Sequence, residues 1–276
     1  MTQEKHTIIQ PKTNFFSLNI AELMQWKFLF FLMVRRNIKV LYQNTAIGIS
    51  WIGIQSILTL LVFSALLMRM GGLETQEIPY PLFAFGGIIL WQGFSKALLH
   101  GSGSLIAQQS VITKVYFPRI LIPFSTVTSV GIDILVNFIF FIALFVVYSF
   151  QPSLTSILSI LLLGLSLVVA FFASLIFCAL SLRYRDLQLI LPFIMQIGQF
   201  ATPIFYPLSA LSRKWQLVVA INPITSVVEL LRWSLFEKYP FPDLFILSVS
   251  FFSFFCMCLM GVYLFNKNER QAAELL

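Results

Sequence analysis

Residues able to do chemistry are sparse in this sequence, and the first pattern to test is a nucleotide-binding loop. Such a loop needs two glycines five positions apart, followed by Lys and then Ser or Thr, so that backbone amides hold the phosphates and the lysine neutralises them. Gly48 and Gly53 have the glycine spacing, but Ile54 and Gln55 follow them. No zinc-protease, serine-hydrolase or Cys-x-x-Cys motif occurs in the sequence. We therefore expect no catalytic residue, no metal site and no cofactor bound by this chain.

The three cysteines do not suggest a disulfide framework or a zinc site. Cys178, Cys256 and Cys258 all lie inside apolar runs. Two positions along a helix correspond to about 200° of rotation, so Cys256 and Cys258 point away from each other and cannot share a ligand.

Asp133 is the one acidic residue inside a predicted membrane segment, and Asn137 follows it by one helical turn. An ionisable group buried in a membrane is costly, which makes it a functional hypothesis by default. The alternative is an aspartate that is protonated or hydrogen-bonded and fixes the packing of helices. The second interpretation is the simpler one, because a proton-coupled carrier usually needs more than one such group.

The elements that position these residues are membrane helices. Hydrophobic residues make up 58% of the 276 residues, charged residues 11% and aromatic residues 16%, and the mean hydropathy is +0.88. Soluble domains have roughly 45–50% apolar and about 25% charged residues. A soluble core cannot cover so much apolar surface, so the composition predicts a polytopic membrane protein. It excludes a disordered chain, a fibrous repeat and a small secreted domain held by disulfides.

Six segments are apolar over the roughly 20 residues that a spanning helix needs. The predicted spans are about 45–68, 80–100, 119–149, 154–181, 187–206 and 244–266. The predicted fold is thus a single all-α membrane domain over 1–276, with a polar segment 1–44, a six-span region 45–266 and a tail 267–276. With both termini in the cytoplasm, 13 of the 18 Lys and Arg residues lie inside and 5 outside. That balance satisfies the positive-inside rule.

Residues 18–44 mix apolar side chains with basic ones, among them Arg35, Arg36 and Lys39. The mixture is typical of an amphipathic helix that lies in the inner interface of a membrane, with its basic residues at the lipid head groups. The same residues could equally be an ordinary basic anchor that fixes the topology. The two interpretations are compatible, and both stay open.

The loop at about 101–118 connects the second and third predicted spans. It opens with Gly101-Ser102-Gly103-Ser104, which allows a sharp exit from the membrane. A short surface helix can follow, and Pro118 ends it because proline lacks a backbone donor. A clipped helix in this place suits the transfer of force from a cytoplasmic partner. From the residues alone, a plain connecting loop is the simpler interpretation.

The segment 207–243 holds two apolar stretches, about 209–220 and 224–236, separated by Asn222-Pro223. Each is about 18 Å long as a helix and is too short to cross the bilayer. The pair predicts a helical hairpin that dips into the outer leaflet and returns, which requires protein or a water-filled cavity around its ends. Glu229 and Arg232 lie three positions apart on one helical face and can form an ion pair.

Aromatic residues near the ends of the predicted spans have two possible functions. Trp and Tyr in such places are usually anchors at the membrane interface. Ring faces that line a pore would also suit sugars, whose C–H faces stack on aromatic rings. The sequence does not separate these functions for residues such as Trp51, Trp91, Tyr80, Tyr206 and Tyr263.

Several motifs, in their order and spacing, resemble the membrane subunit of the bacterial ABC transporters that export polysaccharides, the class of O-antigen, capsule and teichoic-acid exporters. The resemblance covers nearly the whole chain. Its motifs are Tyr42-Gln-Asn-Thr-Ala-Ile-Gly48-Ile-Ser-Trp51, Lys114-Val-Tyr-Phe-Pro-Arg119 with Pro123, Arg183-Tyr-Arg-Asp186, Thr202-Pro-Ile-Phe-Tyr-Pro207 and Asn222-Pro223. One departure is Gln55, where such permeases often have proline, and it puts the local shape of the first span in doubt.

The resemblance implies a permease of the bacterial inner membrane that pairs with a second copy of itself and with two copies of a separate cytoplasmic ATPase subunit, which binds ATP and Mg²⁺. It implies a substrate polysaccharide on an undecaprenyl-type lipid pyrophosphate, and no nucleic acid. The 101–118 segment becomes the coupling helix, and its ATPase-facing residues would be Leu105, Ile106, Gln109, Lys114, Phe117, Pro118 and Arg119. The channel and hairpin residues would be Trp91, Tyr206, Asn222, Pro223, Glu229 and Arg232.

The resemblance also suggests a mechanism. Arg35, Arg36 and Lys39 could attract the anionic pyrophosphate, although their function as topological anchors is equally possible. Closure of the ATPase pair on ATP would push on residues 104–113 and tilt the first and fifth spans apart, opening a path. The alternatives are an ABC exporter of a lipid or drug, a membrane enzyme of envelope synthesis and a proton-coupled carrier that uses Asp133.

Overall fold

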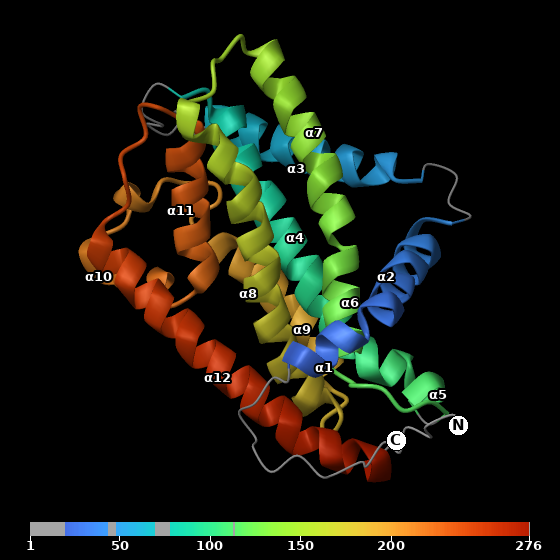
Figure 1. Cartoon of the computed structure of the whole chain (residues 1–276). Helices are drawn as coiled ribbons and strands as arrows, with labels where there is room; N and C mark the ends of the chain where they lie inside the picture. Colours follow the sequence, from blue (N-terminus) through green and yellow to red (C-terminus); the bar gives the residue numbers. More distant parts are fainter. Residues whose placement is uncertain (1–19, 44–47, 70–77, 113, 276) are drawn as a thin grey trace.

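The computed structural model describes residues 20–43, 48–69, 78–112 and 114–275, and within these ranges its secondary structure is helical (Figure 1). The α-helices are α1 (Ile20–Gln25), α2 (Lys27–Tyr42), α3 (Ser50–Arg69), α4 (Tyr80–Ala107), α5 (Gln109–Ile112), α6 (Leu121–Ser129), α7 (Gly131–Val147), α8 (Leu158–Ser181), α9 (Leu187–Ala201), α10 (Arg213–Ala220), α11 (Pro223–Leu235) and α12 (Leu244–Leu275). Two short 3₁₀ turns, Leu154–Ile157 and Leu208–Ala210, precede α8 and α10.

Four of the predicted spans coincide with long apolar helices. These are Tyr80–Ala107, Leu121–Val147, Leu154–Ser181 and Leu244–Asn268. The first and fifth predicted spans coincide with the shorter apolar helices Ser50–Leu66 and Leu187–Ala201. The 15 residues of α9 extend only about 22 Å, less than the roughly 30 Å of hydrocarbon. The chain is therefore a multi-pass membrane protein, and the count of six spans stays a prediction.

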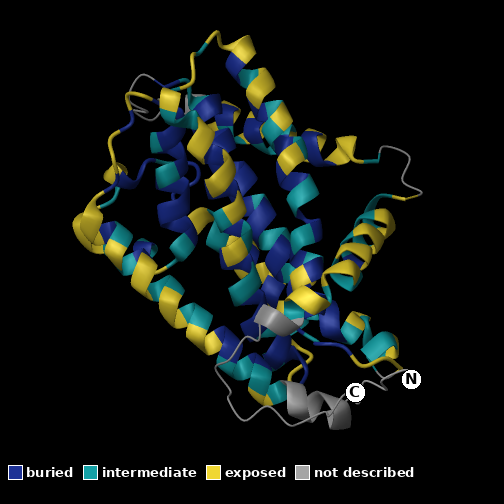
Figure 2. Ribbon diagram, viewed as in Figure 1, coloured by how far each residue is buried: buried dark blue, intermediate teal, exposed yellow. Residues whose placement is uncertain are grey.

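Helix α4 is the centre of the fold. It packs against α3, α6, α7, α8, α9 and α11, and most of its side chains are buried (Figure 2). A helix that is apolar on all sides is stable in a protein only when neighbours cover it all round. The stretch from Leu82 to Leu90 has this composition, and every one of its residues is buried.

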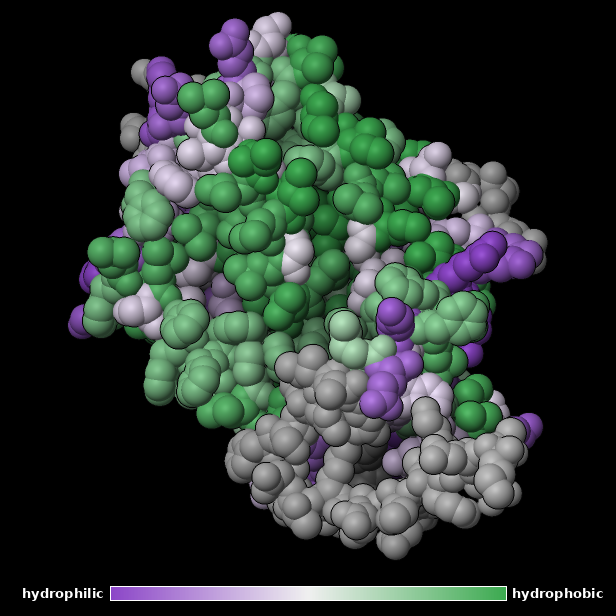
Figure 3. All heavy atoms as spheres, in the orientation of Figure 1, coloured by the Kyte–Doolittle hydropathy of each residue, from purple (hydrophilic) through white to green (hydrophobic). Residues whose placement is uncertain are grey.

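The outer helices expose large apolar side chains. Val146, Leu161, Leu189 and Phe251 are between 68% and 80% exposed, and Figure 3 shows hydrophobic residues over much of one face of the molecule. A contiguous apolar surface of this extent is not stable in water. It is the surface that the hydrocarbon of a membrane covers.

The Gly101–Ser104 segment does not leave the membrane helix, contrary to the prediction. Helix α4 continues through it to Ala107, and a Cβ atom at Gly101 would lie 2.7 Å from the side chain of Ser174 on α8. The hydroxyl groups of Ser102 and Ser104 donate to carbonyls of their own helix, those of Leu99 and Gly101. Small residues here let α4 and α8 approach closely, as is common between membrane helices.

Replacing Gly101 by leucine is expected to destabilise the protein by about 1–3 kcal/mol or more, because the added side chain must displace α8. Gly164 on α8 is a matched control, since a Cβ there meets no atom within 4 Å. Thermal unfolding in detergent should show a lower midpoint for Gly101→Leu than for Gly164→Leu. Equal midpoints would show that the α4–α8 contact does not depend on a small residue at position 101.

Two residues in the topological count do not lie in loops. Lys96 belongs to the middle of α4, and Arg232 is buried in α11 with a side chain 1% exposed. Both already lie within predicted apolar segments, about 80–100 and 224–236, so they carry little weight in the topological count. The positive-inside balance then rests on the remaining basic residues, most of which are still on the predicted inner side.

Helices α10 and α11 meet at a bend of 107°. The bend falls at Asn222, whose side-chain oxygen accepts from the backbone N–H of Ile224 and so caps α11, with Pro223 in the first turn. This is the usual chemistry of a helix start. The predicted division into two short helices at Asn222-Pro223 is confirmed, while the depth of this pair in a membrane stays a prediction.

Candidate functional site

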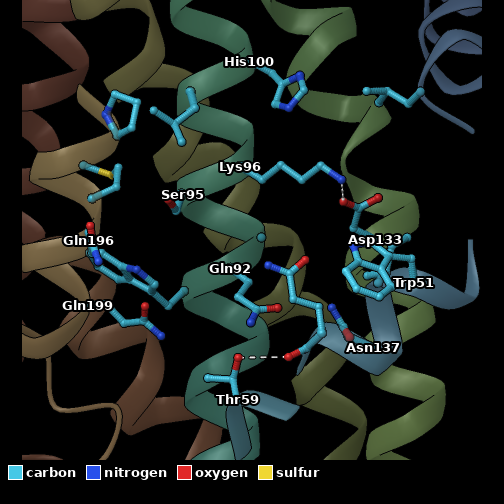
Figure 4. Close-up of a pocket in the computed structure, with 18 of the residues that line it drawn as sticks. Trp51, Thr59, Gln92, Ser95, Lys96, His100, Asp133, Asn137, Gln196 and Gln199 are labelled. Carbon is cyan, nitrogen blue, oxygen red and sulfur yellow. Dashed lines mark hydrogen bonds and ion pairs between the residues drawn. The ribbon is translucent and has the colours of Figure 1, made fainter. Parts of the chain in front are cut away.

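A cavity of about 840 Å³ lies between α3, α4, α7 and α9, with the end of α2 beside it. We call it the groove. Its walls carry many polar side chains, although the helices that form it are apolar overall. The polar side chains of the four helices are Gln55, Thr59, Gln92, Ser95, Lys96, His100, Asp133, Asn137, Gln196 and Gln199 (Figure 4).

Each helix places its polar residues on one side through helical spacing. Positions three and four apart share a helical face, so Gln92, Lys96 and His100 form one stripe along α4. Asp133 and Asn137 form a second stripe on α7. Figure 4 shows these two stripes facing one another across the groove, with Gln196 and Gln199 of α9 on the other side of α4. Polar groups that would be costly in lipid are thereby gathered around one cavity.

Asp133 is bound by two side chains from other elements. The Lys96 ammonium forms an ion pair with one carboxylate oxygen, and the Tyr42 hydroxyl donates to the other. Lys96 also lies 3.2 Å from the Tyr42 oxygen and 5.4 Å from the centre of its ring. The side chain of Asp133 is 5% exposed and that of Lys96 is 33% exposed. Burial, together with the nearby Asp133, raises the pKa of Tyr42, so its hydroxyl keeps its proton.

This network joins three parts of the fold. Tyr42 ends α2, Lys96 belongs to α4 and Asp133 begins α7. Asp133 is therefore hydrogen-bonded and paired with a cation, and its function in helix packing or in proton transfer stays a prediction. Because it is bound by Lys96, Asp133 adds no net charge to the groove.

Two tryptophans also line the groove. Trp51, at the start of α3, is 51% exposed, whereas Trp91 of α4 is 3% exposed. Trp91 packs on α9 where Gly198 lacks a side chain, since a Cβ there would lie 2.8 Å from the indole ring. Trp91 is a predicted channel residue that lines the groove, and the other predicted channel and hairpin residues are not among its lining residues.

The other predicted channel residues lie elsewhere. The Tyr206 hydroxyl donates to the carbonyls of Phe200 and Ala201, and the Asn222 amide donates to Thr202. Glu229 and Arg232 form the predicted ion pair, at 2.9 Å, but both are buried in the protein. The structure therefore gives no support to a channel function for Glu229 and Arg232, because both side chains are buried in the protein and neither lines the groove.

The Glu229–Arg232 pair belongs to a larger buried network. Arg232 donates to the Ile204 carbonyl at 2.8 Å, and its guanidinium lies 3.6 Å from the centre of the Phe83 ring. The Tyr239 hydroxyl donates to Glu229 at 2.8 Å. The network thus ties α11 to α4 and to the segments that follow α9 and α11.

The predicted coupling residues divide into a buried and an exposed group. Leu105 and Phe117 are 1% and 5% exposed and share an apolar cluster with the start of α6, and Pro118 is also buried. Assigning these three to an ATPase-facing surface was wrong for this conformation, because their side chains are covered. Ile106 and Arg119 are partly exposed, Gln109 lies in α5, and Lys114 is exposed.

The structure adds Val115 and Tyr116 to the exposed group, at 56% and 63%. A small depression is lined by Ile112, Lys114, Val115, Tyr116, Phe117 and Arg119. Within the predicted coupling segment, residues 101–107 continue α4, and the separate helix α5 has only the four residues Gln109–Ile112.

The basic residues of the predicted interface helix lie on α2. Arg35, Arg36 and Lys39 are exposed, as are Phe28 and Phe31, at 73% and 66%. The opposite side of α2 packs on α6, where the rings of Phe30 and Phe124 stack at 4.7 Å. The three basic residues are not among those that line the groove.

The glutamine amides of the groove were not predicted from the sequence. Gln92, Gln196 and Gln199 were not singled out, and Gln55 was noted only as a departure from a family pattern. The available signal was the repetition of polar residues at spacings of three or four within apolar helices. That signal is weak in any one helix and becomes clear only where several such helices meet.

Comparison with known proteins places the chain in a family. The family model for the ABC-2 type transporter matches residues 28–236. The O-antigen export system permease protein RfbA of Klebsiella pneumoniae is 29% identical over 255 residues, which cover 90% of this chain and 96% of that protein. The protein of the same name from Myxococcus xanthus is 29% identical over 231 residues, which cover 81% and 86%. The chain therefore belongs to the ABC-2 type transporter family of membrane proteins.

Proposed function

We propose that this chain is the membrane subunit of an ATP-driven exporter that moves lipid-linked polysaccharide across the bacterial inner membrane. Two copies would form the path, and a separate pair of cytoplasmic ATPase subunits would bind ATP and Mg²⁺ and supply the energy. The observation that carries this proposal is the groove, in which amide and indole side chains line a cavity inside an apolar molecule. The names of its relatives, which are O-antigen export permeases, agree with that substrate.

The groove supports a paired arrangement because one chain does not enclose it. Trp51 is half exposed, and Gln55 and Gln196 are exposed. Polar side chains in this position would face lipid in a single copy, which is costly. A second copy placed against the same face would close a polar path between two equivalent grooves, as a two-fold dimer requires.

The lining also favours a polysaccharide over a lipid or drug. A lipid-transporting path needs an apolar wall, whereas this groove carries five amide side chains. A proton-coupled carrier is disfavoured by the contacts of Asp133, because the carboxylate already binds Lys96 and Tyr42.

We propose that force enters near α5 and travels along α4. The exposed residues Lys114, Val115 and Tyr116 lie just beyond α5, and α4 runs without interruption from α5 to the groove. The buried apolar cluster that includes Leu105 and Phe117 would hold this segment to the membrane helices. A push on the exposed surface would therefore shift α4, and with it Gln92 and Lys96.

The experiment that tests the proposal is affinity purification of the chain from its native membranes in a mild detergent, with co-purifying proteins identified by mass spectrometry. We expect an ATPase with Walker motifs in about equal amount. The double substitution Lys114→Ala/Tyr116→Ala should lower ATPase recovery by roughly tenfold or more, since truncating an interface hot spot, a class in which Tyr is enriched, costs about 2 kcal/mol or more.

Trp215→Ala is the control variant, because Trp215 is similarly exposed at 61% but lies on α10, on the predicted outer side. It should leave ATPase recovery unchanged. A stable preparation of the unsubstituted chain that brings down no ATPase would contradict the proposed function. Equal recovery with both variants would contradict only the position of the ATPase surface.

A further inference from the structure

We infer that the groove is a binding path for uncharged glycan chains and discriminates against polyanionic ones. This inference rests on the proposed function, since it takes the groove as the path of a polysaccharide. It goes further by naming the chemical class of polymer that the groove accepts. It is carried by the charges, amides and indoles that the structure places around one cavity.

The first step is the charge of the groove. Among the described residues that line it, those with a formal charge are Lys96 and Asp133, and they bind each other. His100 lies one turn from Lys96, at the end of the same stripe. The amides of Gln92, Asn137 and Gln199 come next along the groove and bring no charge (Figure 4).

The second step is what an anionic polymer would need. A carboxylate or phosphate that leaves water for a membrane-embedded cavity must find a cation to replace its hydration. The positive charge of Lys96 is already compensated by Asp133, whose side chain is 5% exposed, and a competing anion would have to draw Lys96 away from it. A buried carboxylate that loses its cation is strongly destabilised. Each anionic group of the polymer would meet this cost in turn as the chain passed.

The third step is what the amides offer to an uncharged sugar. An amide both donates and accepts hydrogen bonds, and so does a sugar hydroxyl. The Ser56 hydroxyl donates to the Gln92 oxygen at 2.6 Å, which leaves the Gln92 NH₂ group to donate elsewhere. The Asn137 oxygen is buried and has no hydrogen-bond partner among the described residues. A hydroxyl of the polymer could supply that missing donor.

The fourth step is the shape that the indoles add. Trp91 is 3% exposed and packs on α9, whereas Trp51 is 51% exposed, rigid, flat and apolar on its faces, and its indole N–H can donate a hydrogen bond. Such faces match the C–H faces of a pyranose ring, and the adjacent amides match its hydroxyls. A cavity that combines apolar aromatic walls with a few polar groups is typical of a ligand site. None of these contacts requires a charge on the polymer.

The test compares two polymers in one bacterial strain that lacks its own exporter and expresses this chain with its ATPase. One polymer is a lipid-linked neutral hexose chain, and the other is a lipid-linked chain of the same length with one uronate in each repeat. Polymer on the cell surface is measured separately from polymer retained inside. We expect the ratio of uronate to neutral export to be lower by roughly tenfold or more than the ratio of their synthesis.

Substitutions in the groove show whether the discrimination arises there. Gln196→Lys adds a cation and should raise the ratio of uronate to neutral export several-fold, while Gln196→Glu should lower it. Gln151→Lys, an equal charge change at an exposed residue in the loop after α7, should leave the ratio as it is in the unsubstituted chain.

Each other outcome has a distinct meaning. Equal export of both polymers, or a ratio that neither Gln196 variant changes, would overturn the inference and leave the proposed function intact. Export of neither polymer, with the ATPase bound and the protein folded, would overturn the proposed function and this inference with it.

Discussion

Replacing Arg232 by alanine is expected to lower the free energy of unfolding by about 3–5 kcal/mol, the usual effect of removing one partner of a buried ion pair. Glu229 would keep its charge in the interior with only the Tyr239 hydroxyl beside it. The carbonyl of Ile204 would lose its donor at 2.8 Å, and the Phe83 ring would lose the guanidinium above it. One substitution therefore weakens the attachment of α11 to two other segments, α4 and the segment after α9.

The exposed pair Arg213–Asp243 provides the control. Its N–O distance of 2.8 Å is similar to the 2.9 Å of the buried pair, but its side chains are 50% and 45% exposed. Surface pairs contribute about 0–1 kcal/mol, so Arg213→Ala should have a small effect. Thermal unfolding of both variants in the same detergent and at the same scan rate tests the difference. Equal midpoints would mean that the buried network does not stabilise α11.

A conservative variant refines the same prediction. Arg232→Lys keeps the charge but not the planar fork that bonds Glu229 and Ile204 at once. We expect it to recover only part of the lost stability. Full recovery would show that the charge alone matters and that the geometry of the guanidinium does not.

Local patterns in the sequence predicted the parts of the fold that depend on local chemistry. The break at Asn222-Pro223 follows from a cap and a proline, and the Glu229–Arg232 pair follows from helical spacing. The partners of that pair were not predictable in the same way. Ile204 and Phe83 are 25 or more positions from Glu229 in the chain, and only the packing of α11 on α4 brings them to it.

Two features of α4 depend on segments that are distant in the sequence, so local patterns did not predict them. Gly101–Ser104 has the composition of a loop in water, but between membrane helices small residues permit close packing instead. Lys96 lies near the end of an apolar run that the sequence predicts as a span, where a charge is costly. It is stable inside the helix because Asp133, 37 positions later, supplies its counter-ion. In both cases the environment that decides the structure is contributed by a distant segment.

The candidate functional site also depends on segments that are distant in the sequence. Each of the four helices around the groove carries only two to four polar residues in the cavity wall, and no single helix shows a binding motif. The site exists because the packing turns these faces toward one cavity. A sequence pattern can predict that a face is polar, but it cannot predict which other faces will meet it.

Removing Lys96 is expected to be more damaging than removing its partner Asp133, although the two form one ion pair. Asp133 is 5% exposed, so in Lys96→Met it becomes a buried carboxylate without a cation. Lys96 is 33% exposed, so in Asp133→Asn its ammonium can stay hydrated in the groove. We expect Lys96→Met to cost about 2–4 kcal/mol of unfolding free energy and Asp133→Asn about 1–2 kcal/mol.

The double variant Lys96→Met/Asp133→Asn then decides what Asp133 does. If the carboxylate serves only to hold Lys96 and Tyr42, removing both charges should restore most of the stability lost in Lys96→Met, and polymer export should recover with it. If Asp133 instead carried protons for transport, export would be abolished in Asp133→Asn and would remain abolished in the double variant. Measuring unfolding midpoints and surface polymer on the same set of variants separates the two, because a structural pair predicts that stability and export change together.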